Sequence, residues 1–388
     1  MTFYEIICPK CFQRFGPNNV VFRRLSQGEG EEPAVDPYIY HHEFQRGNPG
    51  YAAPSFGYVD PAYLTPSKRI YHNRLLTGVI DDGAGAMAGV TLTQRLCPYC
   101  HAPLHESAGR QETHVVAVTG FTGAGKTTYE AALLSQLLDG PMGLINGNGD
   151  RTLERNIEKL RQDPTTDWDA TDSYLGPYVY DCTSPVLEPG SKKGQRKRFS
   201  LMFYDLPGEK FSSYSEIQRN GRHIVSADTC IFLVDIQNPE SAAQVFHNIA
   251  TNFITGQKKL PMNLALLIYK SDQMGELREK IPNFSNIMGY RNYSAGEPVD
   301  EAAILEVHKQ ICQYVVANND RLCQLEKAVL GVVEPERVRW FVASALRQDK
   351  FQPYNCDEPL LWSLSRMGLY PRVSSQKQGG ILLHEVLV

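Results

Sequence analysis

The stretch "TGFTGAGKTTYE", Thr119–Glu130, decides the fold. It follows the apolar run "HVVAV" and leads directly into "AALLSQLL", so the order is strand, glycine-rich turn and helix. Gly120 to Thr127 match the pattern G-x-x-x-x-G-K-[ST] in full. Glycines let the backbone turn tightly, so that its N–H groups point inward at phosphate oxygens, and the following helix adds its positive dipole end. The stretch therefore predicts a phosphate-binding loop.

The motif also assigns roles to side chains. Lys126 is expected to reach the β- and γ-phosphates of a nucleotide, and the Thr127 hydroxyl is expected to bind Mg²⁺. Two apolar strands end in a carboxylate that could face the same ion, Asp205 and Asp235. Asp205 is preferred because it opens "DLPGE", which fits D-x-x-G. The expected phosphate contacts are Gly120, Gly123, Ala124, Gly125, Lys126, Thr127 and Thr128.

Strand and helix patterns alternate on both sides of this loop, which is typical of a three-layer α/β domain. We predict a P-loop domain of the α/β class, a three-layer sandwich with a mostly parallel six-stranded sheet. Two domains are expected, residues 1–110 and residues 111–388. The expected strands are "HVVAVTG", "PYVYDC", "FSLMFYD", "CIFLVDI", "LALLIYK" and "VRWFVASAL".

Four of the nine cysteines form two pairs with CxxC spacing, Cys8/Cys11 and Cys97/Cys100. Each pair fits a tight turn, and four thiolates around one ion make a closed structural zinc site. The intervening segment is much longer than the usual ~15–20 residues, so a zinc ribbon with a long insertion is predicted. Long loops are tolerated because their closure cost grows only logarithmically with length. Residues 31–70, rich in Pro, Gly and Tyr, are interpreted as loop.

Other features near these motifs have plainer interpretations. His101 and the pair His41 and His42 are interpreted as surface histidines rather than metal ligands. The basic run "SKKGQRKR", residues 191–198, is interpreted as an exposed hairpin tip. The remaining cysteines are expected in the core: Cys182, Cys230, Cys312, Cys323 and Cys356.

Composition limits the classes of partner. The chain has 388 residues, a net charge of −4 and a pI near 6.2, so nothing global attracts nucleic acid or an anionic membrane. No apolar run approaches the ~20 residues that span a bilayer, and "MTFYEIICPKC" lacks the pattern of a secretion signal. Paired cysteines favour a reducing cytosol. We expect a cytoplasmic protein whose zinc module docks a protein in preference to nucleic acid.

Two later motifs complete a known set. "YKSD" ends at Asp272 after the fifth expected strand, and "SAL" begins at Ser344 in the sixth. With the phosphate loop and D-x-x-G, they resemble the translation-factor-related GTPases in order and position. The resemblance implies GTP and Mg²⁺ as cofactors, with Asp272 pairing with guanine N1 and N2. It also places the Lys270 stem along the base and the Ser344–Ala345 backbone at the O6 edge. A carboxylate suits guanine because adenine offers no such pair of donors.

The sequence departs from that family at two positions. Tyr269 stands where the family has Asn or Thr, which ties the base loop to the phosphate loop. Glu209 follows Gly208, whose N–H is expected to sense the γ-phosphate, and it stands where many small GTPases place Gln. A carboxylate there repels the phosphate, so slow intrinsic hydrolysis is expected. The switch threonine that binds Mg²⁺ is assigned to Thr166, with Thr165 and Thr171 as alternatives.

The segments "RTLERNIEKLRQDPTTDWD" and "DEPLLWSLSRMG" extend the resemblance to the bacterial double-GTPase proteins, over roughly residues 113–370. These proteins occur as paired GTPases and are associated with conflict or defence gene clusters. The resemblance therefore implies a second GTPase or an effector as partner, which could supply the missing catalytic group. Two other hypotheses remain: a nucleotide-binding adaptor that hydrolyses little, and a P-loop ATPase.

Overall fold

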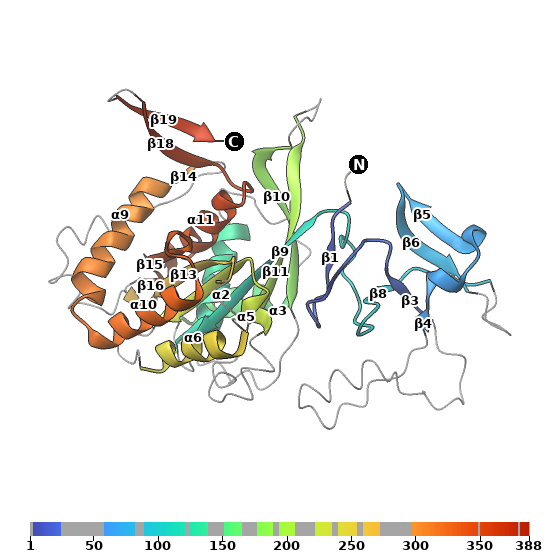
Figure 1. Cartoon of the computed structure of the whole chain (residues 1–388), viewed down its shortest axis with the longest axis horizontal. Helices are drawn as coiled ribbons and strands as arrows, with labels where there is room; N and C mark the ends of the chain where they lie inside the picture. The colour runs from blue at the N-terminus through green and yellow to red at the C-terminus, as the bar shows by residue number, and fades with distance from the viewer. Residues whose placement is uncertain are drawn as a thin grey trace. The chain divides into compact units, whose positions relative to one another are not determined.

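The protein divides into two compact units, Met1–Thr113 and His114–Val388, and each is described by itself (Figure 1). The domain boundary predicted from the sequence lies a few residues before this division. The structure, a computed structural model, describes residues 3–24, 58–81, 89–120, 124–138, 151–164, 177–188, 194–205, 222–234, 240–253, 259–271, 297–347, 350–378 and 381–387.

A central sheet organises the second unit. Among the described residues it has six strands in the order β10-β11-β9-β12-β13-β15. The pairs β9/β12, β12/β13 and β13/β15 are parallel, whereas β10 and β11 form an antiparallel hairpin. The predicted mostly parallel six-stranded sheet is confirmed. The strands are β9 (Glu112–Gly120), β10 (Tyr178–Leu187), β11 (Arg196–Asp205), β12 (Thr229–Val234), β13 (Asn263–Ile268) and β15 (Val338–Val342).

Helices cover both faces of this sheet (Figure 1). One face packs against α2 (Lys126–Leu138), α3 (Arg151–Gln162) and α11 (Glu358–Arg366). The other packs against α5 (Arg222–Val225), α6 (Glu240–Phe253), α9 (Glu301–Ile311) and α10 (Asp320–Val332), with the π-helical turn η6 (Cys312–Val316) extending α9. This is the predicted three-layer arrangement.

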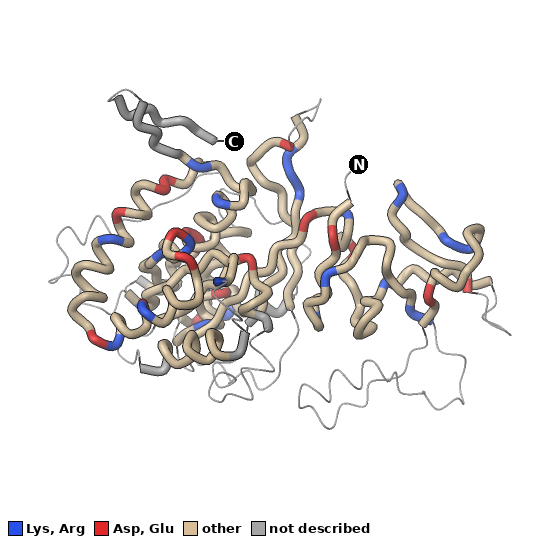
Figure 2. The backbone as a smooth tube through the Cα atoms, viewed as in Figure 1, with Lys and Arg blue, Asp and Glu red and all other residues tan. Residues whose placement is uncertain are grey.

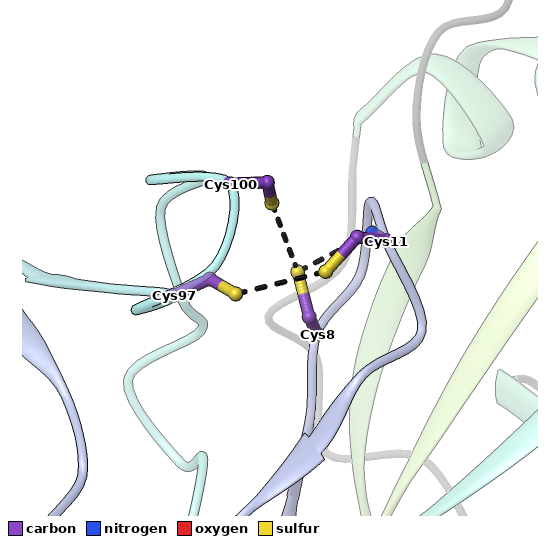
Figure 3. Close-up of side chains that lie close together, drawn as sticks. All are labelled: Cys8, Cys11, Cys97 and Cys100. Carbon is purple, nitrogen blue, oxygen red and sulfur yellow. Dashed lines mark hydrogen bonds between the residues drawn. The ribbon is translucent and has the colours of Figure 1, made fainter. Parts of the chain in front are cut away.

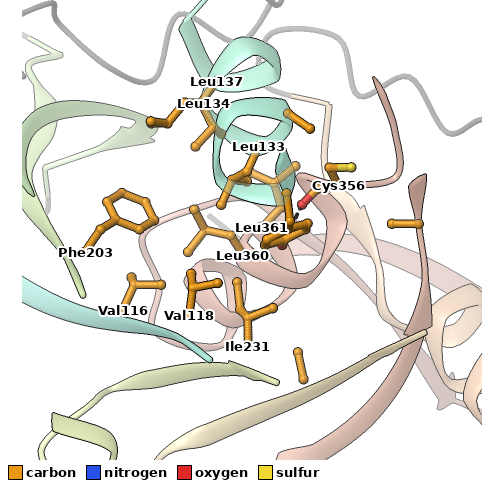
Figure 4. Close-up of a cluster of buried hydrophobic side chains, with 14 of the residues drawn as sticks. Val116, Val118, Leu133, Leu134, Leu137, Phe203, Ile231, Cys356, Leu360 and Leu361 are labelled. Atoms are coloured by element: carbon orange, nitrogen blue, oxygen red, sulfur yellow. Dashed lines mark hydrogen bonds between the residues drawn. The ribbon is translucent and has the colours of Figure 1, made fainter. Parts of the chain in front are cut away.

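The second unit has a hydrophobic core on each face of its sheet, because successive side chains of a strand point to opposite faces. Every residue of β12 is buried; Ile231 and Leu233 enter one core, while Phe232 and Val234 enter the other. Figure 4 shows Val116 and Val118 of β9 facing Leu133 of α2 in the first core. Full burial of one such side chain contributes roughly 1.5–3 kcal/mol. Both ends of the phosphate loop are therefore anchored in the core.

The sixth expected strand, "VRWFVASAL", is wrong as a single element. β15 ends at Val342, and β16 (Ser344–Arg347) pairs instead with β17 (Lys350–Tyr354) in a separate antiparallel hairpin. The break follows from Ala343, whose N–H donates to the Ile268 carbonyl at 3.1 Å before the chain leaves the sheet. A separate three-stranded sheet has the order β14 (Val299–Asp300), β18 (Arg372–Gln378) and β19 (Ile381–Leu387).

The first unit is built from short strands around the cysteine pairs. Its described sheets are β1-β2, β4-β3-β8 and β5-β6-β7. The predicted loop over residues 31–70 is wrong from residue 58 onward, because Pro61 and Pro66 begin two 3₁₀ turns and Asp60 caps the first. The elements are β1 (Ile6–Ile7), β2 (Arg14–Phe15), β3 (Val21–Arg23), β4 (Tyr58–Val59), η1 (Pro61–Tyr63), η2 (Pro66–Lys68), β5 (Arg69–His72), β6 (Leu75–Ile80), β7 (Thr91–Leu92) and β8 (Arg95–Leu96).

Two smaller predictions can be checked in the second unit. The basic run lies where β10 turns into β11, with Leu187 opposite Arg196, and Figure 2 shows its basic residues along β11. Cys182, Cys230 and Cys356 are buried as predicted, but Cys312 and Cys323 are only partly buried because they lie in η6 and on α10 near the surface. Among the described residues, no helix combines the length and apolar character needed to cross a membrane.

Candidate functional site

The strands that carry the nucleotide motifs end at one edge of the sheet. Gly120, the last residue of β9, is in register with Leu233 of β12. Leu233 is opposite Leu267 of β13, and Leu267 is opposite Phe341 of β15. The carboxyl ends of parallel strands are where open α/β sheets bind their ligands. The phosphate loop, the K-x-D motif and the S-A-L segment follow β9, β13 and β15, and therefore begin at the same edge of the sheet.

The phosphate loop takes the expected course where it is described. α2 begins at Lys126, and Thr127 and Thr128 lie in its first turn. The Lys126 ammonium donates a hydrogen bond to the Gly120 carbonyl at 3.3 Å, so its side chain folds back over the loop. A helix N-terminus and an ammonium group on one turn form an anion-binding site.

Gly125 is the tightest point of the loop. Its φ is +85°, a conformation that glycine adopts without strain. A Cβ atom there would lie 2.9 Å from Cε1 of Tyr269 and 3.3 Å from Cε of Lys270. Only glycine fits for both reasons, and the residues after β13 therefore pack directly on the phosphate loop.

Tyr269 makes this contact through its ring. The side chain is buried, and its ring meets that of Tyr129 edge to face with centroids 5.5 Å apart. Tyr129 lies on α2, the helix that begins in the phosphate loop. The aromatic ring thus joins the residues after β13 to the phosphate-loop helix by packing.

The residues of the K-x-D motif are also joined to the chain after β15. The Ser271 hydroxyl donates to the Ala343 carbonyl at 3.0 Å, and the Ser271 N–H reaches the same oxygen at 3.4 Å. Ser344 and Ala345, which follow directly, are buried at the start of β16. Lys270 has a φ of +58° and an exposed side chain beside Gly125. The structure therefore brings Gly120, Lys126, Lys270 and Ser344 to one edge of the sheet.

Several predicted residues are not placed. Asp205 is the last residue of β11, the strand next to β9, and its side chain lies outside the described residues. The following predictions also lie outside the described residues and stay predictions: Gly123, Thr166, Gly208, Glu209 and Asp272, with the alternatives Thr165, Thr171 and Asp235.

Residues that the sequence analysis did not select support the same edge. Tyr354, at the end of β17, has its hydroxyl 2.6 Å from that of Ser271. The Cys356 carbonyl accepts a hydrogen bond from the Tyr129 hydroxyl at 2.9 Å. No short motif could have revealed these contacts, since they join segments far apart in the chain. The serine itself stood inside the quoted "YKSD".

A buried carboxyl adjoins this region. Asp357 is 3% exposed at the start of α11 and caps no N–H of that helix with its side chain. Burial raises its pKa to about 7, because the charged form loses solvation, and the neighbouring Glu358 adds repulsion. Such a carboxyl changes its protonation state near neutral pH. It adjoins Cys356, whose carbonyl accepts a hydrogen bond from Tyr129 of the phosphate-loop helix.

The cysteine pairs of the first unit form a second candidate site (Figure 3). The sulfur atoms of Cys8, Cys11, Cys97 and Cys100 all lie within 4.8 Å of one another. Cys8 and Cys100 are 3.5 Å apart, and Cys11 and Cys97 are 3.7 Å apart. Zn–S bonds of about 2.3 Å in a tetrahedron require sulfurs about 3.8 Å apart. The four free, buried thiols therefore fit one metal ion.

Both pairs adopt the same turn. The Cys8 carbonyl accepts from the Phe12 N–H at 3.1 Å, and the Cys97 carbonyl accepts from the His101 N–H at 3.0 Å. Phe12 and His101 both have positive φ, +59° and +52°. Backbone N–H groups point at the first sulfur of each turn: Lys10 and Cys11 donate to Cys8, and Tyr99 donates to Cys97.

Hydrogen bonding within the cluster divides the four thiols. It lowers the pKa of the Cys11 and Cys97 thiols, chiefly through Cys100, whereas the pKa values of the Cys8 and Cys100 thiols are raised. The expectation of a surface histidine at His101 is wrong: its side chain is 3% exposed, and its ring centroid lies 4.1 Å from that of Tyr58. The residue is buried because the turn directs it under β4, and it is not among the clustered metal-ligand atoms.

A helix-capped phosphate loop at the carboxyl edge of a mostly parallel sheet defines the second unit as a P-loop nucleotide-binding domain. The model of the family described as Double-GTPase 2 matches residues 114–298. Residues 114–298 therefore resemble the Double-GTPase 2 family, and the predicted resemblance to the double-GTPase proteins is confirmed. This range includes the phosphate loop, D-x-x-G and K-x-D motifs. No curated protein matches the sequence.

Solved structures resemble the chain at low similarity. Sup35 complexed with GDP is 15% identical over 61% of this chain and 38% of its own, with a TM-score of 0.24. The GTPase-like domain of Ski7 from S. cerevisiae, bound to GDP and inorganic phosphate, is 12% identical over 69% of this chain and 56% of its own, with a TM-score of 0.35. This chain therefore covers less than two thirds of either protein, 38% of Sup35 and 56% of the Ski7 domain.

Proposed function

We propose that the protein is a GTP-binding, Mg²⁺-dependent molecular switch of the GTPase type. The observation that carries the proposal is the contact between the two halves of the site. Tyr269 and Lys270 of the base motif pack against Gly125 of the phosphate loop, and Ser271 binds the backbone that leads into Ser344. The match to Double-GTPase 2 supports guanine as the base.

The phosphates would be held by the phosphate loop, of which residues 121–123 lie outside the described residues, and by the start of α2. Loop N–H groups and the start of α2 face the triphosphate, and the Lys126 ammonium exchanges its bond to Gly120 for phosphate oxygens. Thr127 and Asp205 would hold Mg²⁺, which neutralises developing charge on the phosphates when bound. On the base side, Asp272 would accept two hydrogen bonds from guanine, with the Lys270 stem along its plane.

Hydrolysis is expected to be slow in the isolated chain. Glu209 follows Gly208 where a water-orienting Gln would serve, and its charge opposes that of the γ-phosphate. Thr166 is the proposed switch residue. A second GTPase or an effector would then complete the catalytic group, and we place this pair in a bacterial conflict or defence system in the cytoplasm.

The four-cysteine cluster would hold Zn²⁺ as a structural ion. All four ligands are cysteines, which leaves no open coordination position for catalysis. Cys8, Cys11, Cys97 and Cys100 come from the two ends of the first unit, so the ion would fasten those ends together. We propose that this unit docks the protein partner, with nucleic acid as the less favoured ligand.

Equilibrium titration with fluorescent GTP and ATP tests the base assignment. We expect GTP to bind at least tenfold more tightly in Mg²⁺, and Lys126→Ala to abolish binding of both. Lys159→Ala, which removes an exposed lysine of α3 in the same unit, should leave both affinities unchanged. Equal or tighter ATP binding would favour the ATPase hypothesis.

Single-turnover phosphate release tests hydrolysis. The rate should be low for the isolated protein and should rise when a partner GTPase encoded beside it is added. Background rates in both conditions would favour the adaptor hypothesis, in which nucleotide is bound but not cut.

A further inference from the structure

Tyr354, the last residue of β17, and Cys356, two residues later, contact three of the segments that carry nucleotide motifs. The Tyr354 hydroxyl lies 2.6 Å from the Ser271 hydroxyl, and the Cys356 thiol donates to the Ser344 carbonyl at 3.4 Å. Towards α2, the Cys356 carbonyl accepts from Tyr129 at 2.9 Å and its N–H donates to Gln136 at 3.1 Å. One short segment therefore binds the K-x-D loop, the S-A-L segment and the phosphate-loop helix.

The direction of the hydroxyl bonds follows from proton counting. A serine hydroxyl carries one proton, and Ser271 donates it to the Ala343 carbonyl at 3.0 Å. Tyr354 must therefore donate to Ser271. Both side chains are buried, with exposed fractions of 8% and 3%. These two hydrogen bonds form a buried relay from Tyr354 through Ser271 to Ala343, which fixes the position of Ser271. Loss of either bond costs free energy, because a buried hydroxyl gives up a hydrogen bond.

The relay fixes a strained part of the base loop. Lys270 precedes Ser271 and has a φ of +58°, a conformation that is unfavourable for a residue with a side chain. Such a conformation persists only where the surrounding structure holds it. The contacts that hold this conformation include those of Ser271 with Ala343 and Tyr354, and that of Tyr269 with Gly125.

We infer that Tyr354 is a positioning residue for recognition of the guanine base. Its hydroxyl fixes Ser271, which follows Lys270 and directly precedes Asp272, the residue proposed to bind guanine. This inference rests on the proposed function. Tyr354 acts through Ser271 and not on the nucleotide.

The test compares GTP with ITP, which lacks the 2-amino group that Asp272 would bind. Tyr354→Phe removes the hydroxyl and keeps the ring. The GTP-to-ITP affinity ratio should fall about three- to tenfold, the size expected for one lost hydrogen bond, while the affinity for ITP changes little. A purely structural role would weaken binding of both nucleotides equally and leave the ratio unchanged.

Three further variants complete the experiment. Ser271→Ala should lower the same ratio, and the double variant should be no worse than Ser271→Ala alone, because both residues act through one relay. Tyr180→Phe, a buried tyrosine of β10 at the other edge of the sheet, should leave the ratio unchanged. If the unaltered protein prefers GTP but the GTP-to-ITP ratio is unchanged in Tyr354→Phe and Ser271→Ala, the inference about Tyr354 is overturned and the guanine assignment stands. No preference for GTP in the unaltered protein would overturn the guanine assignment as well.

Discussion

Both candidate sites are turns that direct backbone N–H groups at an anion, and they differ in where the anion comes from. In the first unit the anions are thiolates of the chain itself, and the N–H groups of Lys10 and Cys11 point at Cys8. In the second unit the anion would be a ligand phosphate, and the loop before Lys126 supplies backbone and helix dipole. The cysteine cluster therefore depends on side-chain identity, whereas the phosphate loop depends on backbone conformation.

The difference also concerns how far each site reaches along the sequence. The cysteine turns are local, but the cluster joins Cys8 to Cys100 across almost the whole first unit. The phosphate loop is contiguous, yet its shape is fixed by Tyr269 from another strand. Removing a ligand should thus break the first site outright, and altering a glycine should distort the second.

Cys97→Ser gives the largest expected effect. With three thiolates left, the metal should be lost, and apparent binding energies of roughly 10–16 kcal/mol for structural zinc are also folding energies. We expect zinc content, measured by elemental analysis, to fall from about one ion per chain to none. The first unit should become sensitive to proteolysis, while GTP binding persists.

The matched control is Cys323→Ser, which alters a partly buried cysteine of α10 whose thiol donates to the Val316 carbonyl. A serine hydroxyl can make the same bond, so zinc content should be unchanged. Zinc absent from the unaltered protein, or retained by Cys97→Ser, would contradict the four-thiolate site.

The sequence predicted the contiguous features of both units. The phosphate loop, both CxxC turns and the succession of strands along the chain follow from local patterns, since glycine spacing and apolar runs act within a few residues. It did not predict the break at Ala343 or the contact of Tyr354 with Ser271, because these depend on hydrogen bonds between distant segments. Burial of His101 was missed for the same reason, since Tyr58 covers it from far along the chain.

The buried acids of the two units are perturbed by different causes. The thiols of the first unit act on one another, which lowers the pKa of Cys11 and raises that of Cys100, whereas burial raises the pKa of the Asp357 carboxyl in the second unit to about 7. The unfolded carboxyl has a pKa of about 4. Between about pH 4 and pH 7 the Asp357 carboxyl is ionised in the unfolded state but still protonated in the folded state. The folded state therefore loses stability as the pH rises, and the loss is complete above about pH 7. Three pKa units correspond to about 4 kcal/mol.

Asp357→Asn tests this assignment. The variant should gain stability relative to the unaltered protein as the pH rises from 4 to 8, by up to about 4 kcal/mol. Urea unfolding of the second unit, followed at several pH values, measures the difference. Asp300→Asn, at the exposed cap of α9, controls for loss of a charge. A difference that does not vary with pH would contradict the raised pKa.

The smallest expected effect tests the phosphate loop. In Gly125→Ala, the positive φ costs about 1–2 kcal/mol, and the added methyl would press on the Tyr269 ring 2.9 Å away. Relief of that contact moves the base loop away from the phosphate loop. We expect GTP affinity, measured by calorimetry, to fall at least tenfold, which corresponds to about 1.4 kcal/mol. Zinc content should not change.

Gly331→Ala makes the same substitution where neither constraint applies. This glycine lies within α10, and a methyl added there would meet no described atom within 4 Å. Alanine is favoured over glycine in a helix by about 1 kcal/mol, so this variant should be more stable and bind GTP normally. If both alanine variants bind GTP equally well, the loop tolerates a side chain at 125, and the base motif does not hold its shape. Opposite signs of the two stability changes, with affinity lost only at 125, would instead establish that backbone conformation governs this site as side-chain identity governs the other.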